Sequence, residues 1–204
     1  MNEKRKEEII MSTLKLASQQ GLGGVSMNMI AEDIGIKKPS LYNHFKSKEE
    51  LVNEMYLFLR GKAQKQTNTQ MDFNIFDKNS AYEILSTLVN NYILLSSEPN
   101  IQMFYKVIYS ERTISSEAAN ILAIETNKMI NATTEIFKIL ENKKLLQFRN
   151  IDICATSFAL TIHGLMDYSL DQAFANNQSP IINTELIHVY IENFCNEHCL
   201  KEDL

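Results

Sequence analysis

The chain has 204 residues, of which 45% are hydrophobic and 22% charged, and it contains only 6 Gly and 3 Pro. Average usage would give roughly 25 Gly and Pro at this length, so their scarcity argues against turn-rich sandwiches and barrels. The formal net charge is −5, yet residues 1–65 carry 11 Lys and Arg against 8 Asp and Glu, whereas residues 66–204 carry 9 against 17. We therefore expect an all-α protein with a basic N-terminal part and an acidic body.

Apolar residues recur at helical spacing along the whole chain, and capping residues mark where helices begin. Ser26 is an expected N-cap, and Ser47 with Glu50 and Ser80 with Glu83 have the spacing of capping boxes. We expect helices at about 4–20, 27–34, 39–45, 48–66, 81–97, 99–109, 116–142, 150–176 and 183–200. The polar stretch 67–70 and the irregular stretch 71–79 are the expected boundary between a small N-terminal unit and the rest.

Residues 27–45 have the layout of a helix-turn-helix, with Gly35 in the turn and Pro39 in the first turn of the second helix. In that motif the second helix enters the DNA major groove. Lys37 and Lys38 stand at the start of this helix, where the macrodipole disfavours cations, so an outside anion such as a phosphate would compensate. The next polar side chains, which suit base edges and phosphate oxygens, are Ser40, Tyr42, Asn43 and His44. Asn43 could pair with adenine through two hydrogen bonds.

The string IAEDIGIKKPSLYNHFKSKEEL, Ile30–Leu51, resembles the signature of the TetR/AcrR family of bacterial transcriptional regulators. That signature has an Ile-Ala pair, a Gly turn, a Leu-Tyr-x-His-Phe recognition helix and a Lys-x-x-Leu start to the next helix. The resemblance covers about residues 4–60. It implies a helix-turn-helix DNA-binding domain at 1–47 and a larger C-terminal domain at 48–204 for effector binding and dimerisation, with helix 48–66 as the linker.

The resemblance also implies which side chains meet DNA. The implied DNA-binding residues are Ser26, Lys37, Lys38, Ser40, Tyr42, Asn43, His44 and Lys48. Ser26 and Lys48 match phosphate contacts, and Leu41 and Phe45 match apolar positions that hold the recognition helix in place. Lys37 stands where the family usually has Ser, and Pro39 where it usually has Gly. Outside this signature, a Tyr and a His on a short helix could equally be packed or solvated.

The expected helix at 150–176 is apolar almost all round, which is typical of a helix buried on more than one side. Gly164 lies in its middle, where Gly costs about 1 kcal/mol relative to Ala, and this favours a close helix approach or pocket space. In the family the last two long helices pair with their symmetry mates. We therefore expect a homodimer through helices at about 150–176 and 183–200, bound to an inverted-repeat operator.

A small-molecule effector pocket is expected in the C-terminal domain, with aromatic, Met and polar side chains as its walls. The candidate residues are Tyr92, Met103, Phe104, Tyr109, Phe137, His163, Met166 and Asp167. Aromatic and Met side chains at helical spacing are also what an ordinary core contains. A polar stripe on the helix at 150–176 consists of His163, Asp167 and Asp171. It would form either a surface or interface network or a polar anchor for the effector, and a metal site is the remaining alternative.

Three cysteines, an odd number, fit reduced thiols, and no apolar run approaches the ~18 to 20 residues of a membrane span or a signal peptide's hydrophobic region. We therefore expect a cytoplasmic protein without membrane contact. His188, Glu192, Cys195 and Cys199 share a helical stripe beside His198. One helix offers only two ligands to one metal, so buried or idle cysteines outrank metal binding or thiol sensing, and no metal or cofactor is expected.

The resemblance, together with the helix-turn-helix pattern, implies a ligand-responsive DNA-binding regulator, a repressor in the family's commonest form, whose partners are double-stranded operator DNA and a small molecule. One alternative is a helical interaction protein that has this fold without operator binding. An enzyme is the other, but the glycines at 21–24 follow a helix and not a strand, so they do not form a phosphate loop. No His lies in a recognisable nucleophile or zinc motif either.

Overall fold

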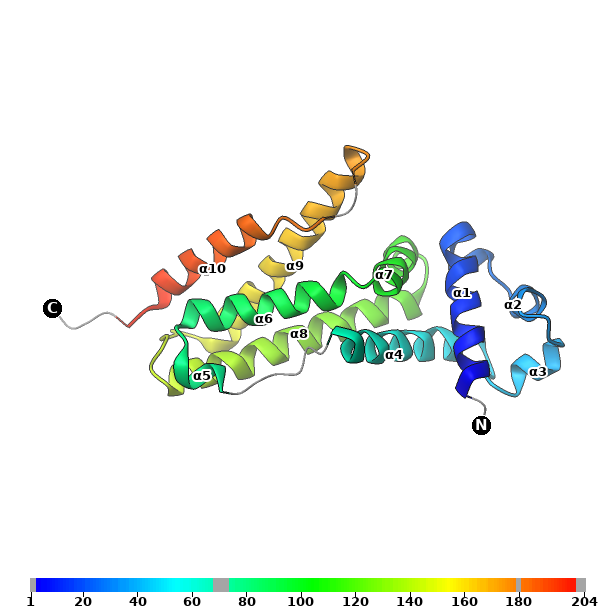
Figure 1. Ribbon diagram of the computed structural model, residues 1–204, viewed down its shortest axis with the longest axis horizontal. Coiled ribbons are helices and arrows are strands. Elements are labelled where there is room, and N and C mark those ends of the chain that lie inside the picture. The colour runs from blue at the N-terminus through cyan, green and yellow to red at the C-terminus, as the bar shows by residue number, and fades with distance from the viewer. Residues whose placement is uncertain (1–2, 68–73, 179–180, 201–204) are drawn as a thin grey trace. The chain divides into compact units, whose positions relative to one another are not determined.

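The computed structural model describes residues 3–67, 74–178 and 181–200, and within them every regular element is an α-helix (Figure 1). This confirms the all-α prediction. The helices are α1 (Glu3–Gly24), α2 (Met27–Asp33), α3 (Lys38–Tyr42), α4 (Lys48–Thr67), α5 (Ile75–Lys78), α6 (Ala81–Ser96), α7 (Pro99–Glu111), α8 (Ser116–Asn142), α9 (Ile151–Ala175) and α10 (Thr184–His198). Among the described helices, none combines the length and the apolarity that crossing a membrane would require.

Side-chain caps explain why most helices begin where the sequence predicts. At α6, Ser80 Oγ accepts a hydrogen bond from Glu83 N (3.3 Å) while the Glu83 carboxylate accepts from Ser80 N (2.8 Å), a complete capping box. At α4, Ser47 Oγ accepts from Glu50 N (3.1 Å), but the Glu50 carboxylate accepts from Lys46 N (2.6 Å) and not from Ser47 N. These bonds satisfy backbone donors that a helix start leaves unpaired.

Two details differ from the expectation, and a third agrees with it. The stretch 71–79, expected to be irregular, contains the short helix α5, whose Phe76 is buried; residues 68–73 of the expected boundary lie outside the described residues. Helix α3 ends at Tyr42 and not near residue 45, although Phe45 N still donates to Leu41 O (3.1 Å). Helix α1 is interrupted at Gly21, whose φ of 75° and ψ of 158° are non-helical, as the glycine cluster predicted.

The chain divides into two compact units. Unit 1 comprises residues 1–68 and 95–124, and unit 2 comprises residues 69–94 and 125–204. Helix α8 therefore contributes its first residues to unit 1 and the rest to unit 2. This division describes packing, and the predicted functional boundary between residues 47 and 48 stays a prediction about DNA-binding and effector-binding roles.

The core of unit 1 joins the N-terminal helices to α7. Phe104 of α7 is fully buried and its ring lies 5.9 Å from that of Tyr56 on α4. The same cluster holds the fully buried Ile9 and Leu14 of α1 and Ile30 of α2. Each such side chain contributes about 1.5–3 kcal/mol through burial, so α7 is part of the scaffold that positions the N-terminal helices.

The core of unit 2 is built around aromatic rings. Phe137 of α8 is fully buried, stacks on Phe148 at 4.5 Å between centroids, and meets Phe158 of α9 and Phe194 of α10 at 5.5 and 5.4 Å. Offset and edge-on ring pairs of this kind add about 0.5–1.5 kcal/mol each beyond their burial. This cluster fixes α10 to α9.

Candidate nucleic-acid interface

The turn between α2 and α3 has the geometry that the sequence predicts. Ser26 is the N-cap of α2, and its Oγ accepts from Met29 N at 3.2 Å. Gly35 follows α2 with a φ of +68°, a left-handed conformation that favours glycine. Lys37 occupies the N-cap position of α3 without a side-chain cap, and Pro39 lies in the first turn. Residues 27–42 therefore form a helix, a tight turn and a second helix.

Two apolar side chains anchor α3 to the helices beneath it. Leu41 and Phe45 are both 0% exposed, and the ammonium of Lys6 on α1 lies 5.4 Å from the centre of the Phe45 ring. Because consecutive helical residues point in different directions, burial of this pair turns the rest of α3 towards solvent.

The residues predicted to contact DNA lie on or beside that exposed surface. Tyr42 has 41% of its surface exposed. The other exposed members of the set are Ser26, Lys37, Lys38, Ser40 and Asn43, and the half-buried ones are His44 and Lys48. The structure thus leaves all eight at least partly accessible.

Contacts within the protein leave several of these groups able to donate outward. The Ser26 hydroxyl oxygen accepts its capping bond, so its own O–H remains a donor. Lys48 Nζ donates to the carbonyl of Leu22, and an ammonium has two further N–H bonds. Nδ1 of His44 is buried and has no hydrogen-bond partner among the described residues, so an outward contact from this ring falls to Nε2.

The acidic side chains at the end of α2 bond to residues other than the α3 lysines. Glu32 Oε1 accepts from Asn28 Nδ2 at 2.6 Å, and Asp33 accepts from α1. Lys38 Nζ lies 6.0 Å from the centre of the Tyr42 ring, and Lys37 is exposed beside it. The surface of α3 therefore presents positive charge together with hydrogen-bonding groups, a combination that suits a phosphate backbone.

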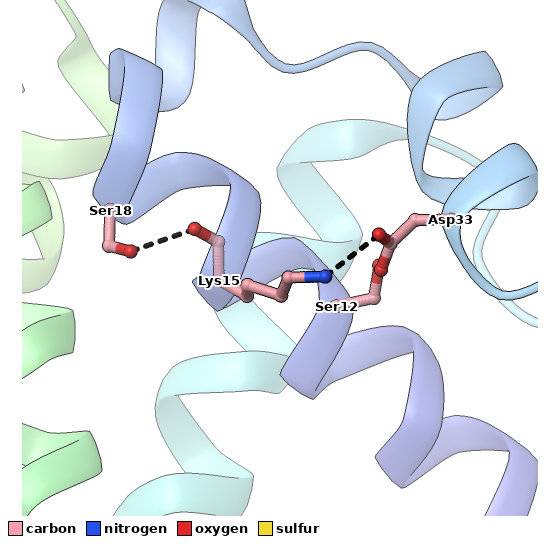
Figure 2. Close-up of polar contacts among 4 residues, drawn as sticks. All are labelled: Ser12, Lys15, Ser18 and Asp33. Carbon is pink, nitrogen blue, oxygen red and sulfur yellow. Dashed lines mark hydrogen bonds and ion pairs between the residues drawn. The ribbon is translucent and has the colours of Figure 1, made fainter.

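Asp33 joins the end of α2 to α1 (Figure 2). Its two carboxylate oxygens accept from Ser12 Oγ at 2.7 Å and from Lys15 Nζ at 3.0 Å, while Ser18 Oγ donates to the Lys15 carbonyl at 2.7 Å. The hydrogen bond from Ser12, followed by that from Lys15, lowers the pKa of the Asp33 carboxyl. The sequence analysis did not predict these contacts of Asp33 with Ser12 and Lys15, which fix the angle between α1 and α2.

Asp33→Asn is expected to lower the melting temperature at pH 7, with a smaller difference at acidic pH. A carboxyl whose folded pKa is depressed stabilises the fold above its ordinary pKa of about 3.9 and loses that contribution as the pH falls through the folded value. Thermal unfolding by circular dichroism at pH 7 and pH 3 measures this, with Glu32→Gln as the control. If Asp33→Asn lowers the melting temperature equally at both pH values, the Asp33 carboxylate does not stabilise the fold through these contacts.

Glu111, the last residue of α7, is a second residue that sequence reasoning missed. It is only 8% exposed, and its Oε1 accepts from Gly23 N at 3.1 Å. A side chain at Gly21 would place its Cβ 3.0 Å from the same oxygen. Lys48 holds Leu22 in the same glycine-rich turn, so this turn before α2 is fixed from both α7 and α4.

The predicted effector residues fall in both compact units. Phe104 is fully buried in unit 1, where Met103 is 37% exposed and Tyr109 half-buried, with its ring centre 5.2 Å from the Arg112 guanidinium. In unit 2, Phe137 is fully buried and Met166 is 5% exposed. The remaining candidates in unit 2 are the half-buried Tyr92, His163 and Asp167, and Nδ1 of His163 lies 3.8 Å from a carboxylate oxygen of Asp167.

Helices α9 and α10 expose large apolar side chains. On α9 the exposed fractions are 65% for Ile153, 46% for Leu160 and 55% for Phe174, and a Cβ added at Gly164 would have no atom within 4 Å. On α10, Leu186 and Val189 are 41% and 48% exposed. At helical spacing Ile153, Leu160 and Gly164 share one face of α9, and this face is open in the single chain.

Comparisons with known proteins agree with this geometry. The family model described as bacterial regulatory proteins, tetR family, matches residues 9–55. The tetracycline repressor protein class C of Escherichia coli is 34% identical over 55 residues, which are 27% of this chain and 25% of that protein. The biofilm operon icaADBC HTH-type negative transcriptional regulator IcaR of Staphylococcus epidermidis is 26% identical over 114 residues, which are 55% of this chain and 58% of that protein.

Similarity to solved structures extends over nearly the whole chain. The flavonoid-responsive regulator FrrA superposes with a TM-score of 0.69 over 96% of this chain and 95% of that one, at 18% identity, a likeness of fold. The matches to IcaR and to the tetracycline repressor, in contrast, span about three fifths and a quarter of those proteins' own lengths. The family model matches residues 9–55, a range that contains the helix-turn-helix.

Proposed function

We propose that this chain, which belongs to the TetR family of bacterial transcriptional regulators, represses transcription. It binds an inverted-repeat operator as a homodimer and leaves the DNA when a small molecule binds. The observation that carries the proposal is the exposed surface of α3, where lysines and polar side chains surround Tyr42 while Leu41 and Phe45 are fully buried. Because operator DNA is its partner, we place its action in the cytoplasm. We propose no enzymatic activity.

In the proposed complex the N-terminal residues of α3 enter the major groove. Tyr42, Asn43 and Ser40 reach base edges or phosphate oxygens, and Lys37 and Lys38 face the backbone. The hydroxyl of Ser26, the second nitrogen of His44 and the remaining N–H groups of Lys48 donate to phosphates on either side. Domain 1–47 thus reads DNA, helix α4 is the linker, and the rest of domain 48–204 binds the effector and the second subunit.

The exposed apolar face of α9 and α10 supports dimerisation. Ile153, Leu160 and Phe174 offer apolar surface to a partner, and Gly164 leaves room for a helix to approach closely. A second copy of the chain, related by a twofold axis, would cover the same face on both subunits. Two recognition helices then read two half-sites about one helical turn apart.

Effector release is proposed as a population shift between two dimer states that differ in the separation of their recognition helices. The proposed effector contacts are Met103, Phe104 and Tyr109 within unit 1, and Tyr92, Phe137, His163, Met166 and Asp167 within unit 2. Within unit 1, the contact between Phe104 on α7 and Tyr56 on α4 would pass a displacement of α7 to the helix that carries Lys48.

Fluorescence anisotropy with DNA from upstream of the chain's own gene tests the proposal. We expect saturable binding that weakens steeply with salt, because each phosphate contact releases counterions. Light scattering should give a dimer, and titration should give two chains per operator. Absence of binding at low salt would refute the repressor and favour a helical interaction protein, and a monomer on DNA would refute the dimer.

A further inference from the structure

A cysteine and a histidine meet where α9 begins and α10 ends. Cys154, in the first turn of α9, has its Sγ 3.6 Å from Nε2 of His198, the last residue of α10. Both side chains are half-buried. A thiol within hydrogen-bond reach of an imidazole nitrogen is the arrangement that activates a cysteine nucleophile.

The position of the His198 ring is fixed by its other contacts. Nδ1 lies 2.9 Å from the carbonyl oxygen of Phe194, and because a carbonyl can only accept, Nδ1 carries a proton. In the neutral ring Nε2 therefore presents its lone pair to the sulfur. The ring also stacks on Phe194 at 4.3 Å between centroids and lies 5.3 Å from the ring of Phe148. The base is thus held in place beside the thiol.

In the part of the chain that the structure describes, neither of the other two cysteines has a histidine contact of this kind. Cys195 is buried, and this burial raises the pKa of its thiol to about 11. Cys199 is exposed and its thiol donates to the backbone oxygen of Asn196 at 3.1 Å. His188, which shares their helical stripe in the sequence, instead contacts the Tyr82 hydroxyl at 3.5 Å. The cysteine that the fold places beside a histidine is therefore Cys154, which lies outside that stripe.

We propose that Cys154, with His198 as its base, is a covalent modification site for soft electrophiles of the α,β-unsaturated carbonyl class. The thiol proton passes to Nε2 while the sulfur electron pair forms a bond to the β-carbon. The alkene π pair shifts to the bond between the α-carbon and the carbonyl carbon, and the carbonyl π pair moves onto the oxygen. The enolate then takes a proton from the imidazolium, which leaves a saturated thioether and a neutral ring. The reaction consumes only the thiol and the electrophile.

The chemistry of the pair favours this class of reagent. A thiolate is a soft, polarisable nucleophile and adds to soft electrophiles, while the buried rings of Phe148 and Phe194 hold the imidazole of His198 in place. The covalent step involves unit 2 alone and requires no DNA, so its test is independent of operator binding.

Alkylation kinetics test the proposal in the full-length protein. The protein is treated with limiting N-ethylmaleimide, quenched at intervals, digested and analysed by peptide mass spectrometry, so that all three cysteines are measured in one molecule. We expect Cys154 to react at least about tenfold faster than the exposed Cys199, although it is less accessible. In urea, where the base is no longer adjacent, the three rates should converge.

Two variants separate the base from the packing. His198→Asn retains a donor for the Phe194 carbonyl, and His198→Phe retains a ring; both should reduce the Cys154 rate to or below that of Cys199 and leave the Cys199 rate unchanged. If Cys154 reacts more slowly than Cys199 in the unsubstituted protein, or keeps its rate in both variants, the proposal is wrong. The comparison within the unsubstituted protein decides the matter even if a variant fails to fold.

Discussion

Tyr42→Ala is expected to weaken operator binding about 5- to 150-fold, or by about 1–3 kcal/mol, with little change in thermal stability. The side chain is 41% exposed, whereas Leu41 and Phe45, which anchor α3, are fully buried. Removing the tyrosine therefore deletes a proposed DNA contact but leaves the packing of α3 in place. Anisotropy titrations against the operator at fixed salt, together with melting curves, measure the two effects separately.

Two further variants make the Tyr42 result specific. Tyr42→Phe keeps the ring beneath the Lys38 ammonium and removes only the hydroxyl, so its loss of affinity reports the hydrogen bond to DNA. Tyr82→Ala removes a tyrosine of similar exposure, 37%, on α6, and should leave affinity unchanged. An unaltered operator affinity in Tyr42→Ala would remove this residue from the proposed interface.

Helix boundaries could be predicted because caps act within four residues. Asn150 and Asn183 were expected to open the two last long helices, and each side chain accepts from the backbone three residues on, at 3.0 and 3.3 Å. Gly35 could be predicted for the same reason, since only a local conformational demand is involved. Helix α5 could not, because its four residues depend on burial of Phe76 within unit 2 and carry no cap.

Contacts between distant residues lay beyond sequence reasoning. The hydrogen bond from Gly23 to Glu111 spans 88 residues and the contact from Cys154 to His198 spans 44. From the sequence alone, the carboxylate of Glu111 at the end of a helix is expected to be solvated, and only the folded structure shows that it is buried. The motif predicted which side chains stand on α3, but the groups that fix the turn before α2 came only from the packing of α7 and α4.

Glu111→Ala is expected to destabilise unit 1 by about 0.5–1.5 kcal/mol, since it removes the acceptor of the Gly23 N–H. Glu111→Gln retains a carbonyl oxygen and should lose less. Both variants should weaken operator binding through a loosened turn before α2, in the order Ala greater than Gln. Thermal unfolding gives the stability change, and hydrogen exchange at the Gly23 amide reports the lost bond directly.

Gly21 and Glu111 should also be energetically coupled. Gly21→Ala alone is expected to cost about 1–3 kcal/mol, because its φ of 75° and ψ of 158° lie in a region nearly confined to glycine and because its Cβ would stand 3.0 Å from Glu111 Oε1. Gly21→Ala combined with Glu111→Ala removes the close contact but not the backbone strain, so the double variant should lose less than the sum of the two. Gly23→Ala, whose Cβ would lie 3.8 Å from the carboxylate, is the matched control. Strict additivity would mean that the glycine turn and the end of α7 are held independently, and that Glu111 does not position the DNA-reading helices.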